Sequence, residues 1–210
     1  ENSNLSNSVI KTILRSKSGT VWLGTDFGLG EMHEDLNVSA YFHDLNNKTS
    51  LVNNIVWDVF EDNSGTIWFG TNNGLSILSN TNGRFEFYPI SYSHENIKVG
   101  YEVRDIIETS SGNYWIASQN GLNKFNREKE TFRRFFYQSQ LDTEEDRNFS
   151  IVVPGKNKLW LATWSSSILQ FDLKKETFSR LELKTEEPEV KAEAPAEEAQ
   201  VEQTEEAPAE

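Results

Sequence analysis

The chain has 210 residues and a formal net charge of −13, and it contains no cysteine. The missing thiols exclude disulfides and thiolate metal sites. No basic stripe suits nucleic acid, and no apolar run approaches the roughly 20 residues that span a bilayer. We therefore expect neither a nucleic-acid partner nor a membrane span in this chain.

One pattern of fifteen residues occurs three times along the chain, and a looser copy occurs once more. The tryptophans that anchor these copies are 46, 47 and 45 residues apart. They are Trp22, Trp68, Trp115 and Trp160. A fixed period of about 40–50 residues indicates a propeller or a solenoid.

Each repeat predicts four short strands, taken here in chain order. The first repeat gives 8–14, 20–25, a segment ending at Met32, and 38–42. The second gives 54–60, 66–71, a segment ending at Leu78, and 85–88. The third gives 102–108, 113–118, a segment ending at Phe125, and 132–136. The fourth gives 149–153, 158–163, a segment ending at Phe171, and 178–183.

Four antiparallel strands per repeat form the blade of an all-β propeller. The blades are expected over about 5–43, 51–90, 100–137 and 148–183, within a propeller region of residues 1–183. Four blades are the lower end of the usual range of about 4–8, and no strand is left over to complete a shared blade. We therefore favour a partial propeller, an open arc; a small four-bladed ring is the alternative.

The repeated glycines and tryptophans have structural roles in this interpretation. Glycine tolerates positive φ in the turn that precedes each tryptophan. The turn glycines are Gly19, Gly65 and Gly112. The four repeat tryptophans are expected to fill the gaps between neighbouring blades, because a single blade cannot bury its own faces.

The stretch IVWDVFEDNSGTIWFGTNNGL, residues 55–75, resembles the two-component regulator propeller repeat nearly throughout. The first and third repeats resemble it well, whereas the fourth has Ala162 in place of a glycine and lacks the Asn-Gly-Leu corner. The resemblance implies an extracytoplasmic (periplasmic) sensor propeller of a bacterial receptor. In that family the propeller precedes a membrane span and an output domain such as a histidine kinase or diguanylate cyclase, and some members respond to carbohydrates.

A ligand site is expected on the face that carries the corners between second and third strands. Polar corner side chains there can donate and accept hydrogen bonds, as sugar hydroxyls require. The candidates are Asp26, Asn72, Asn73, Gln119 and Asn120. The other interpretation is that these residues only suit turn geometry.

Two tryptophans outside the repeat pattern are further ligand-binding candidates. Trp164 occupies a corner where the other repeats have Asp, Asn or Gln, and it could stack on a sugar ring. Trp57 lies on the innermost strand, at the position where the first and third repeats have Lys11 and Arg104, so it could line the channel. Packing is the alternative for both tryptophans.

No motif in the sequence indicates a catalytic site, a metal site or a cofactor site. His33, His43 and His94 have no ligand spacing, and the acidic cluster 142–146 lacks the glycine and spacing of a calcium loop. The final segment, 184–210, contains ten Glu and two Lys with no aromatic residue, so we predict a disordered acidic tail.

The predicted function is a non-catalytic ligand-sensing module that binds an oligosaccharide or another small extracellular ligand. Its other partners would be the remaining blades and the kinase or cyclase output domain of the receptor, with a homodimer as a further option. Any catalytic output would lie in a domain absent from this chain. A protein–protein interaction scaffold is the alternative, and a propeller lyase or hydrolase ranks third.

Overall fold

The computed structural model describes residues 9–79, 83–88, 102–110, 112–137, 148–164 and 168–181. Within these residues the regular elements are sixteen strands in four antiparallel sheets of four. The predicted all-β propeller of four-stranded blades is confirmed. The acidic tail predicted for residues 184–210 lies outside the described residues.

Each sheet is one blade. Blade 1 contains β1 (Ile10–Arg15), β2 (Val21–Thr25), β3 (Gly28–Met32) and β4 (Val38–Tyr41). Blade 2 contains β5 (Val56–Glu61), β6 (Ile67–Thr71), β7 (Gly74–Leu78) and β8 (Phe85–Tyr88). Blade 3 contains β9 (Val103–Glu108), β10 (Tyr114–Ser118), β11 (Gly121–Asn126) and β12 (Thr131–Phe135). Blade 4 contains β13 (Phe149–Pro154), β14 (Lys158–Thr163), β15 (Ile168–Asp172) and β16 (Thr177–Arg180).

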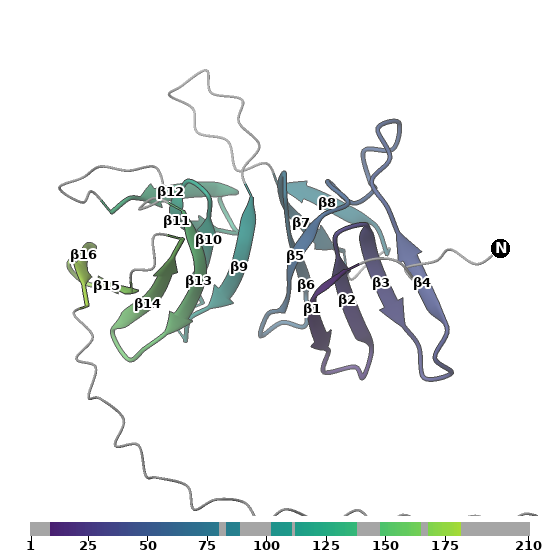
Figure 1. Cartoon of the computed structure of the whole chain (residues 1–210), viewed down its shortest axis with the longest axis horizontal. Coiled ribbons are helices and arrows are strands. Elements are labelled where there is room, and N and C mark those ends of the chain that lie inside the picture. The colour runs from purple at the N-terminus through teal and green to yellow at the C-terminus, as the bar shows by residue number, and fades with distance from the viewer. Residues whose placement is uncertain are drawn as a thin grey trace, which may run out of the picture.

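Each blade is a simple meander whose strands pair in chain order. The first strands of successive blades contact one another, β1 with β5, β5 with β9, and β9 with β13. They form the inner edge of an arc, with blades 1 and 4 at its two ends (Figure 1). The four described sheets do not close into a ring, so the structure is the open arc and not the four-bladed ring.

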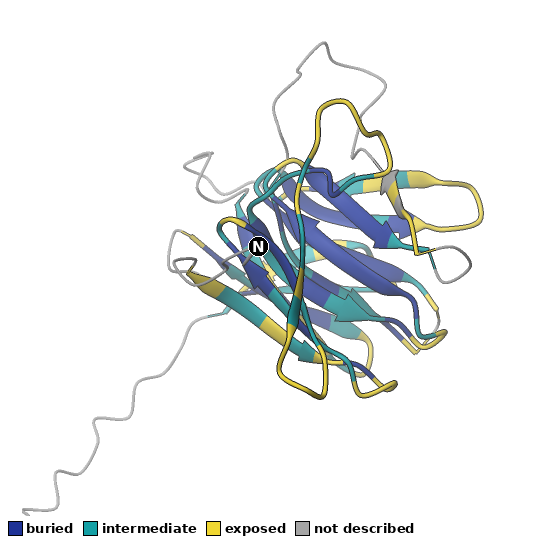
Figure 2. Ribbon diagram, turned by 90° about the vertical axis from the view of Figure 1, so that its right-hand side faces the viewer, coloured by how far each residue is buried: buried dark blue, intermediate teal, exposed yellow. Residues whose placement is uncertain are grey.

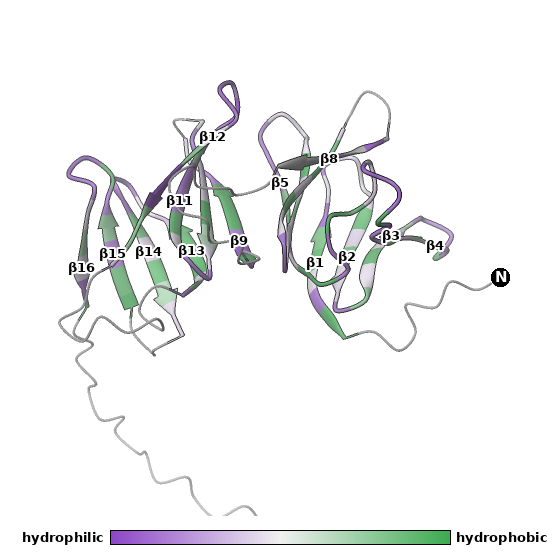
Figure 3. Cartoon of the chain, turned by 90° about the horizontal axis from the view of Figure 1, so that it is seen from above, coloured by the Kyte–Doolittle hydropathy of each residue, from purple (hydrophilic) through white to green (hydrophobic). Residues whose placement is uncertain are grey.

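Buried hydrophobic side chains gather on the middle strands, such as β6 and β10, and at the joins between blades. Strand β14 is mostly hydrophobic, whereas the outer strand β12 is mostly hydrophilic (Figure 3). Figure 2 shows the same trend as burial, with buried residues in the middle of the sheets and exposed residues in the turns. This pattern is expected where both faces of a sheet meet neighbouring sheets.

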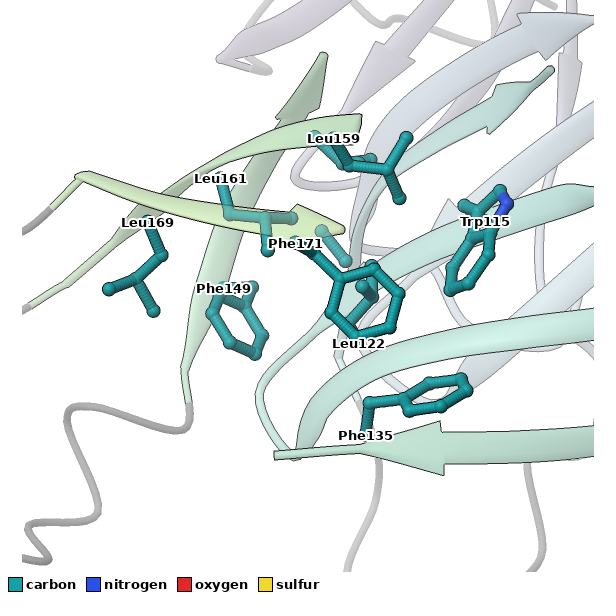
Figure 4. Close-up of a cluster of buried hydrophobic side chains, with 10 residues drawn as sticks. Trp115, Leu122, Phe135, Phe149, Leu159, Leu161, Leu169 and Phe171 are labelled. Atoms are coloured by element: carbon teal, nitrogen blue, oxygen red, sulfur yellow. The ribbon is translucent and has the colours of Figure 1, made fainter. Parts of the chain in front are cut away.

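The repeat tryptophans lie on the face of each blade that meets the following blade. The Trp68 ring lies 4.6 Å from the Tyr114 ring of blade 3, and the Trp115 ring lies 5.3 Å from the Phe171 ring of blade 4. Figure 4 shows the cluster between blades 3 and 4. Trp22, Trp68 and Trp115 are buried. Trp160 is only partly buried, since it lies on the uncovered face of blade 4.

The corner between second and third strands is closed by a hydroxyl group. Oγ1 of Thr25 donates to the carbonyl of Gly28 at 2.8 Å, and Thr71 makes the equivalent bond to Gly74 at 2.8 Å. In blade 3, Ser118 keeps the hydroxyl in place of threonine. At the opposite end of the blades the turn glycines have φ of 93°, 81° and 71°; they are Gly19, Gly65 and Gly112.

Candidate functional site

A β-bulge interrupts the first strand of every blade near its N-terminal end. In blade 1, Ile10 pairs with Thr25 and Thr12 pairs with Gly24, so the residue between them has no partner in the ladder. The same irregularity recurs in the other three blades. The unpaired residues are Lys11, Trp57, Arg104 and Ser150, and we call them the bulge row. A bulge turns a side chain away from the regular faces of the sheet.

Side chains of the bulge row stack across the blades. Nζ of Lys11 lies 4.0 Å from the centroid of the Trp57 ring, and Cζ of Arg104 lies 3.9 Å from the same centroid. Arg104 Cζ also lies 5.0 Å from the centroid of the Trp164 ring. Cations and aromatic rings therefore alternate from blade 1 to blade 4. Each such contact contributes about 0.5–2 kcal/mol, depending on its exposure.

The corners between second and third strands lie beside the bulge row. In each blade, the backbone N–H of the first corner residue donates to the carbonyl of the residue two positions before the bulge. These bonds measure 3.2, 3.0, 3.1 and 3.1 Å; they join Asp26 to Val9, Asn72 to Ile55, Gln119 to Glu102, and Trp164 to Asn148. We call the surface formed by the bulge row and these four corner residues the rim.

The rim brings some of the predicted site residues together. Nε1 of Trp57 donates to Oδ1 of Asn72 at 3.2 Å, and Trp164 joins them through Arg104. Asp26 lies at the blade 1 end, where its Oδ1 accepts the N–H of Val9 at 2.9 Å.

The second corner residues lie one position further along each turn. The backbone N–H of Asn73 donates to Oγ1 of Thr71 at 3.2 Å, and Asn120 makes the same bond to Ser118 at 3.3 Å. These bonds involve the backbone, so they leave the amide side chains available to face solvent.

The two rim tryptophans differ in how much surface they offer to a ligand. Both faces of Trp57 are occupied, one by Lys11 and the other by Arg104. Trp164 is 59% exposed, and Arg104 is the cation beside it. Trp164 is therefore the aromatic side chain of the rim that a ligand can reach without displacing another residue.

Arg104 is the central residue of the stack, and sequence reasoning noted it only as the counterpart of Trp57. It forms an ion pair with Glu102, and its side chain is 11% exposed. Its Nε is buried and has no hydrogen-bond partner among the residues that the structure describes. Oδ1 of Asn148, at the start of blade 4, is likewise buried without a partner in the described part of the chain. The signal that could have found Arg104 is its position in the repeat, one blade after Trp57.

Two aspartates that sequence reasoning missed connect the inner strands. Oδ2 of Asp58 accepts the N–H of Ile106 in blade 3 at 2.9 Å. Oδ2 of Asp105 accepts the N–H of Val152 in blade 4 at 2.7 Å. Burial raises the pKa of both carboxyls, and the charge of Asp105 raises the pKa of Asp58 further. The pair therefore holds a proton at a pH where an exposed carboxyl is ionised.

A third aspartate anchors the opposite end of the blades. Asp62 is fully buried, and its Oδ2 accepts from Nε1 of Trp68 at 2.9 Å and from Nη1 of Arg127 at 3.0 Å. Burial alone raises the pKa of Asp62, but hydrogen bonds from Ser64, Trp68, Thr66 and Tyr114 outweigh it, so the pKa is lowered. This carboxylate is a structural anion between blades 2 and 3.

The histidines within the described residues serve local contacts. His33 Nε2 lies 3.0 Å from Oγ of Ser39, and His43 Nδ1 lies 2.8 Å from the carbonyl of Leu51. His94 and the acidic cluster 142–146 lie outside the described residues. In the part of the chain that is described, no three His, Cys, Asp or Glu residues gather as metal ligands would.

Sequence comparison identifies the repeats. The sequence model of the two component regulator propeller family matches residues 4–27 and 50–73. Two segments of the chain therefore match the two component regulator propeller repeat. The resemblance seen in residues 55–75 is thereby confirmed, and the two matches cover the first two strands of blades 1 and 2. A comparison with curated protein sequences gives no match.

Solved structures share the fold. The extracellular domain of the hybrid two component system BT3049 from B. thetaiotaomicron has a TM-score of 0.68 at 19% identity, and the alignment covers 85% of this chain. PorZ, a surface component of the type-IX secretion system of Porphyromonas gingivalis, has a TM-score of 0.59 at 14% identity over 78% of this chain. YCF48 bound to D1 peptide has a TM-score of 0.56 at 13% identity over 86% of this chain.

The chain spans only part of each of these proteins. It covers 25% of the BT3049 domain, 26% of PorZ and 55% of YCF48. At these identities the comparisons establish the propeller fold alone. Among the described residues, no helix is long and apolar enough to cross a bilayer.

Proposed function

We propose that this regulator propeller is a non-catalytic, extracytoplasmic sensor module of a bacterial receptor and that it binds a carbohydrate on the rim. The repeat family and the likeness to the extracellular domain of a two component system support the sensor assignment. The exposed Trp164 beside the Arg104 stack is the observation that carries the ligand assignment. An indole face next to polar corner residues suits a sugar ring, which has apolar faces and a polar edge.

The arrangement of the carboxyl groups supports a binding role and not a catalytic one. Asp58 and Asp105 have the raised pKa values that general acids use. However, each accepts a backbone N–H of the next blade, so each is committed to the join between blades. A glycosidase instead needs two carboxyls placed across the scissile bond of its substrate.

The proposed mechanism is a change in the balance between two receptor states. A carbohydrate can shift that balance only through different affinities for the two states. The rim joins residues of all four blades, so a ligand held on it would favour one relative placement of the blades. The remaining blades and a kinase or cyclase output domain of the receptor would then carry the signal across the membrane.

A thermal-shift screen against plant, algal and animal oligosaccharides tests this function. A ligand that binds only the native state raises the melting temperature. At a ligand concentration of a hundred times its Kd, the free energy of unfolding rises by about 2.7 kcal/mol. We expect one glycan class to give a saturable shift that Trp164→Ala removes. Ser179→Ala, an exposed change on the outer strand β16, is the matched control. A folded protein that no oligosaccharide stabilises would contradict the carbohydrate assignment.

A protein-interaction scaffold is the second candidate, because two blade faces are uncovered. Ile13 on blade 1 is 66% exposed, and Ile151 on blade 4 is 51% exposed. Extended apolar surface of this kind marks interaction sites. A scaffold would bind a protein partner through these faces, and substitution of Trp164 would leave that binding unchanged. Saturable binding of a small glycan at the rim separates the two functions.

A further inference from the structure

Every join inside the arc is built from the same positions of two successive blades. The earlier blade contributes its repeat tryptophan, and the later blade contributes four apolar side chains. Around Trp68 of blade 2 these are Ile106, Tyr114, Ile116 and Phe125 of blade 3. Around Trp115 of blade 3 the equivalent side chains of blade 4 are Val152, Leu159, Leu161 and Phe171. We call the face that carries the repeat tryptophan the tryptophan face of a blade, and the opposite face its receiving face.

The receiving face of blade 1 has apolar residues at the same four positions. The register of the strand pairs places them there, since Ile13 pairs with Leu23 and Val21 with Met32, as Ile106 pairs with Ile116 and Tyr114 with Phe125. In blades 3 and 4 all four residues are buried. In blade 1 none of the four is buried, and Ile13 is 66% exposed. Blade 1 therefore presents a complete receiving face at one end of the arc.

A cavity on this face lies where a tryptophan of a preceding blade would pack. Val21 and Met32 are among the residues that line it, and its volume is about 440 Å³. Tyr114 and Phe125 hold the same two positions in blade 3, and their rings lie 4.6 and 5.8 Å from the Trp68 ring. The cavity is therefore the counterpart of the place that Trp68 fills in blade 3.

The tryptophan face of blade 4 lies at the other end of the arc and carries the matching side chains. Trp160 pairs with Val153 as Trp68 pairs with Phe60, and neither Trp160 nor Val153 is buried. Ile151, which is 51% exposed, holds the position of Asp58.

The position of Ile151 determines what it would meet in a following blade. Asp58 reaches across its join to the N–H of Ile106, which is equivalent to Ile13 of blade 1. A copy of blade 1 placed after blade 4 would therefore bring Ile13 against Ile151, one exposed isoleucine against another.

The charges at the two ends of the arc are complementary as well. At the join between blades 2 and 3, Nη2 of Arg127 donates to Oγ1 of Thr66 at 3.2 Å. Glu34 of blade 1 follows Met32 by two positions, as Arg127 follows Phe125, and Lys158 precedes its repeat tryptophan by two positions, as Thr66 does. A copy of blade 1 placed after blade 4 would therefore bring Glu34 beside Lys158, a pair of opposite charges.

One hydrogen bond of the first join has no counterpart between blade 4 and blade 1, but it is dispensable. Oε2 of Glu61 accepts the N–H of Lys17 at 2.7 Å. The residue equivalent to Glu61 is Pro154 in blade 4 and Arg15 in blade 1, and neither side chain is an acceptor. The join between blades 3 and 4 forms without this bond. Lys156 takes the position of Lys17, and both it and Arg15 are exposed, so their charges can extend into water.

We propose that two copies of this chain associate head to tail, with blade 4 of each copy against blade 1 of the other, in a closed ring of eight blades. Blades 1 and 4 are the two ends of the arc, so both ends of each copy take part (Figure 1). Trp160 of each copy fills the cavity beside Val21 and Met32 of the other. Eight blades lie within the usual range of about 4–8, and a head-to-tail contact that closes leaves no blade face uncovered.

Sedimentation velocity of the whole chain tests this association. We expect a concentration-dependent dimer whose limiting mass is that of two chains. Trp160→Ala should weaken it about thirtyfold or more, as truncation of an interface anchor does. Ile13→Lys should weaken it as much as Ile151→Lys does, because the two isoleucines meet. Circular dichroism confirms that each variant is folded. Weakening by Ile151→Lys alone would show that two copies of blade 4 pair with each other and would overturn the head-to-tail contact.

Charge reversal identifies the pairing directly. Glu34→Lys places two positive charges at each join and Lys158→Glu places two negative ones, so each variant alone should self-associate about fivefold more weakly than wild type. An equimolar mixture of the two variants should associate as tightly as wild type, because each join again has one charge of each sign. Glu128→Lys, an exposed change in the turn between β11 and β12, is the matched control and should behave as wild type. A mixture that associates no better than either variant alone would overturn the pairing.

The limiting mass tests the closure of the ring. Assemblies that grow beyond two copies would show that the contact does not close, and would overturn the eight-bladed ring. A protein that stays monomeric at every concentration would overturn the association itself. Neither result bears on carbohydrate sensing, which the oligosaccharide screen tests separately.

Discussion

Asp62 accepts a hydrogen bond from Nε1 of Trp68 at 2.9 Å, whereas Nε1 of Trp22 is buried and finds no partner among the described residues. The difference has a local cause. Ser16 of blade 1 occupies the position of Asp62, since both donate their backbone N–H to the carbonyl four residues later. The side chain of Ser16 is turned to Thr20 and Ser18. Two equivalent tryptophans therefore pack alike but differ in whether the indole N–H is satisfied.

Replacing Asp62 should be far more damaging than replacing its counterpart. We expect Asp62→Ala to lower the free energy of unfolding by about 3–5 kcal/mol, because Arg127, Trp68 and Tyr114 all lose their acceptor. Ser16→Ala should cost about 1 kcal/mol. Urea unfolding of both variants gives the comparison, and similar losses would contradict the assigned role of Asp62.

The Asp58–Asp105 pair should make stability fall as the pH rises. The pKa of Asp58 is raised from 3.8 to about 7, chiefly by burial and then by the charge of Asp105. Within this window the folded state keeps a proton that the unfolded state has lost, so raising the pH favours unfolding. The contribution is fully present below the unfolded pKa and is lost as the pH passes the folded pKa.

Asp58→Asn isolates that contribution, because asparagine keeps an acceptor for the Ile106 N–H but does not titrate. The urea midpoint of the variant, relative to wild type, should rise between pH 4 and 7. Asp62 acts in the opposite sense, since its lowered pKa adds stability that is lost in acid. Wild type and Asp58→Asn both contain Asp62, so its effect cancels in the comparison. Parallel pH curves would show that the pair does not share a proton.

Gly70 marks a place where two blades approach too closely for a side chain. A Cβ there would lie 2.8 Å from the carbonyl oxygen of Val103 and 2.8 Å from its Cγ1. We expect Gly70→Ala to destabilise the protein by about 1–3 kcal/mol, as overpacking does. The reverse change at the equivalent position of blade 3, Ala117→Gly, should cost about 0.5–1 kcal/mol. A Gly70→Ala protein as stable as wild type, in urea unfolding, would refute the close approach.

The uncovered face of blade 4 should drive self-association. Ile151 and Val153 are 51% and 49% exposed there. Trp160, the partner of Val153 on the adjacent strand, is partly exposed. Ile151→Lys should reduce concentration-dependent association in sedimentation velocity while changing the free energy of unfolding by about 0.5 kcal/mol or less. The neighbouring change Val152→Lys places a charge in the core between blades 3 and 4 and should unfold the protein. Unchanged association of Ile151→Lys would show that this face is not responsible.

Much of the fold follows from the spacing of four tryptophans. That spacing predicts four blades, and residue patterns within each repeat place the strands to within a few residues. The predicted strand 66–71 appears as Ile67–Thr71, and 85–88 appears unchanged. The pattern succeeds because every blade buries the same positions against its neighbours, so the same residue types recur at those positions in each repeat.

The rim could be predicted only in part. The corners are visible in the sequence, because turns demand particular residue types. The bulge is not, since one extra residue in a strand leaves no mark on composition. If the bulge is not known, Lys11 and Arg104 are indistinguishable from ordinary strand residues in the sequence. Their stacking on Trp57 also depends on the angle between blades, which the sequence does not give. The orphan atoms of Arg104 and Asn148 likewise depend on distances between segments far apart in the chain.

The repeated bulge sets one residue of each first strand apart from the paired ladder. A bulge residue has no partner in the ladder, so strand pairing does not fix its identity, and its contacts are those it makes along the rim. Within this one chain the position holds lysine, tryptophan, arginine and serine, while the tryptophan position of the same repeats never changes. Exchange of one bulge residue would therefore change the contacts along the rim, where neighbouring bulge residues stack on one another, and leave the paired ladder of each blade as it is.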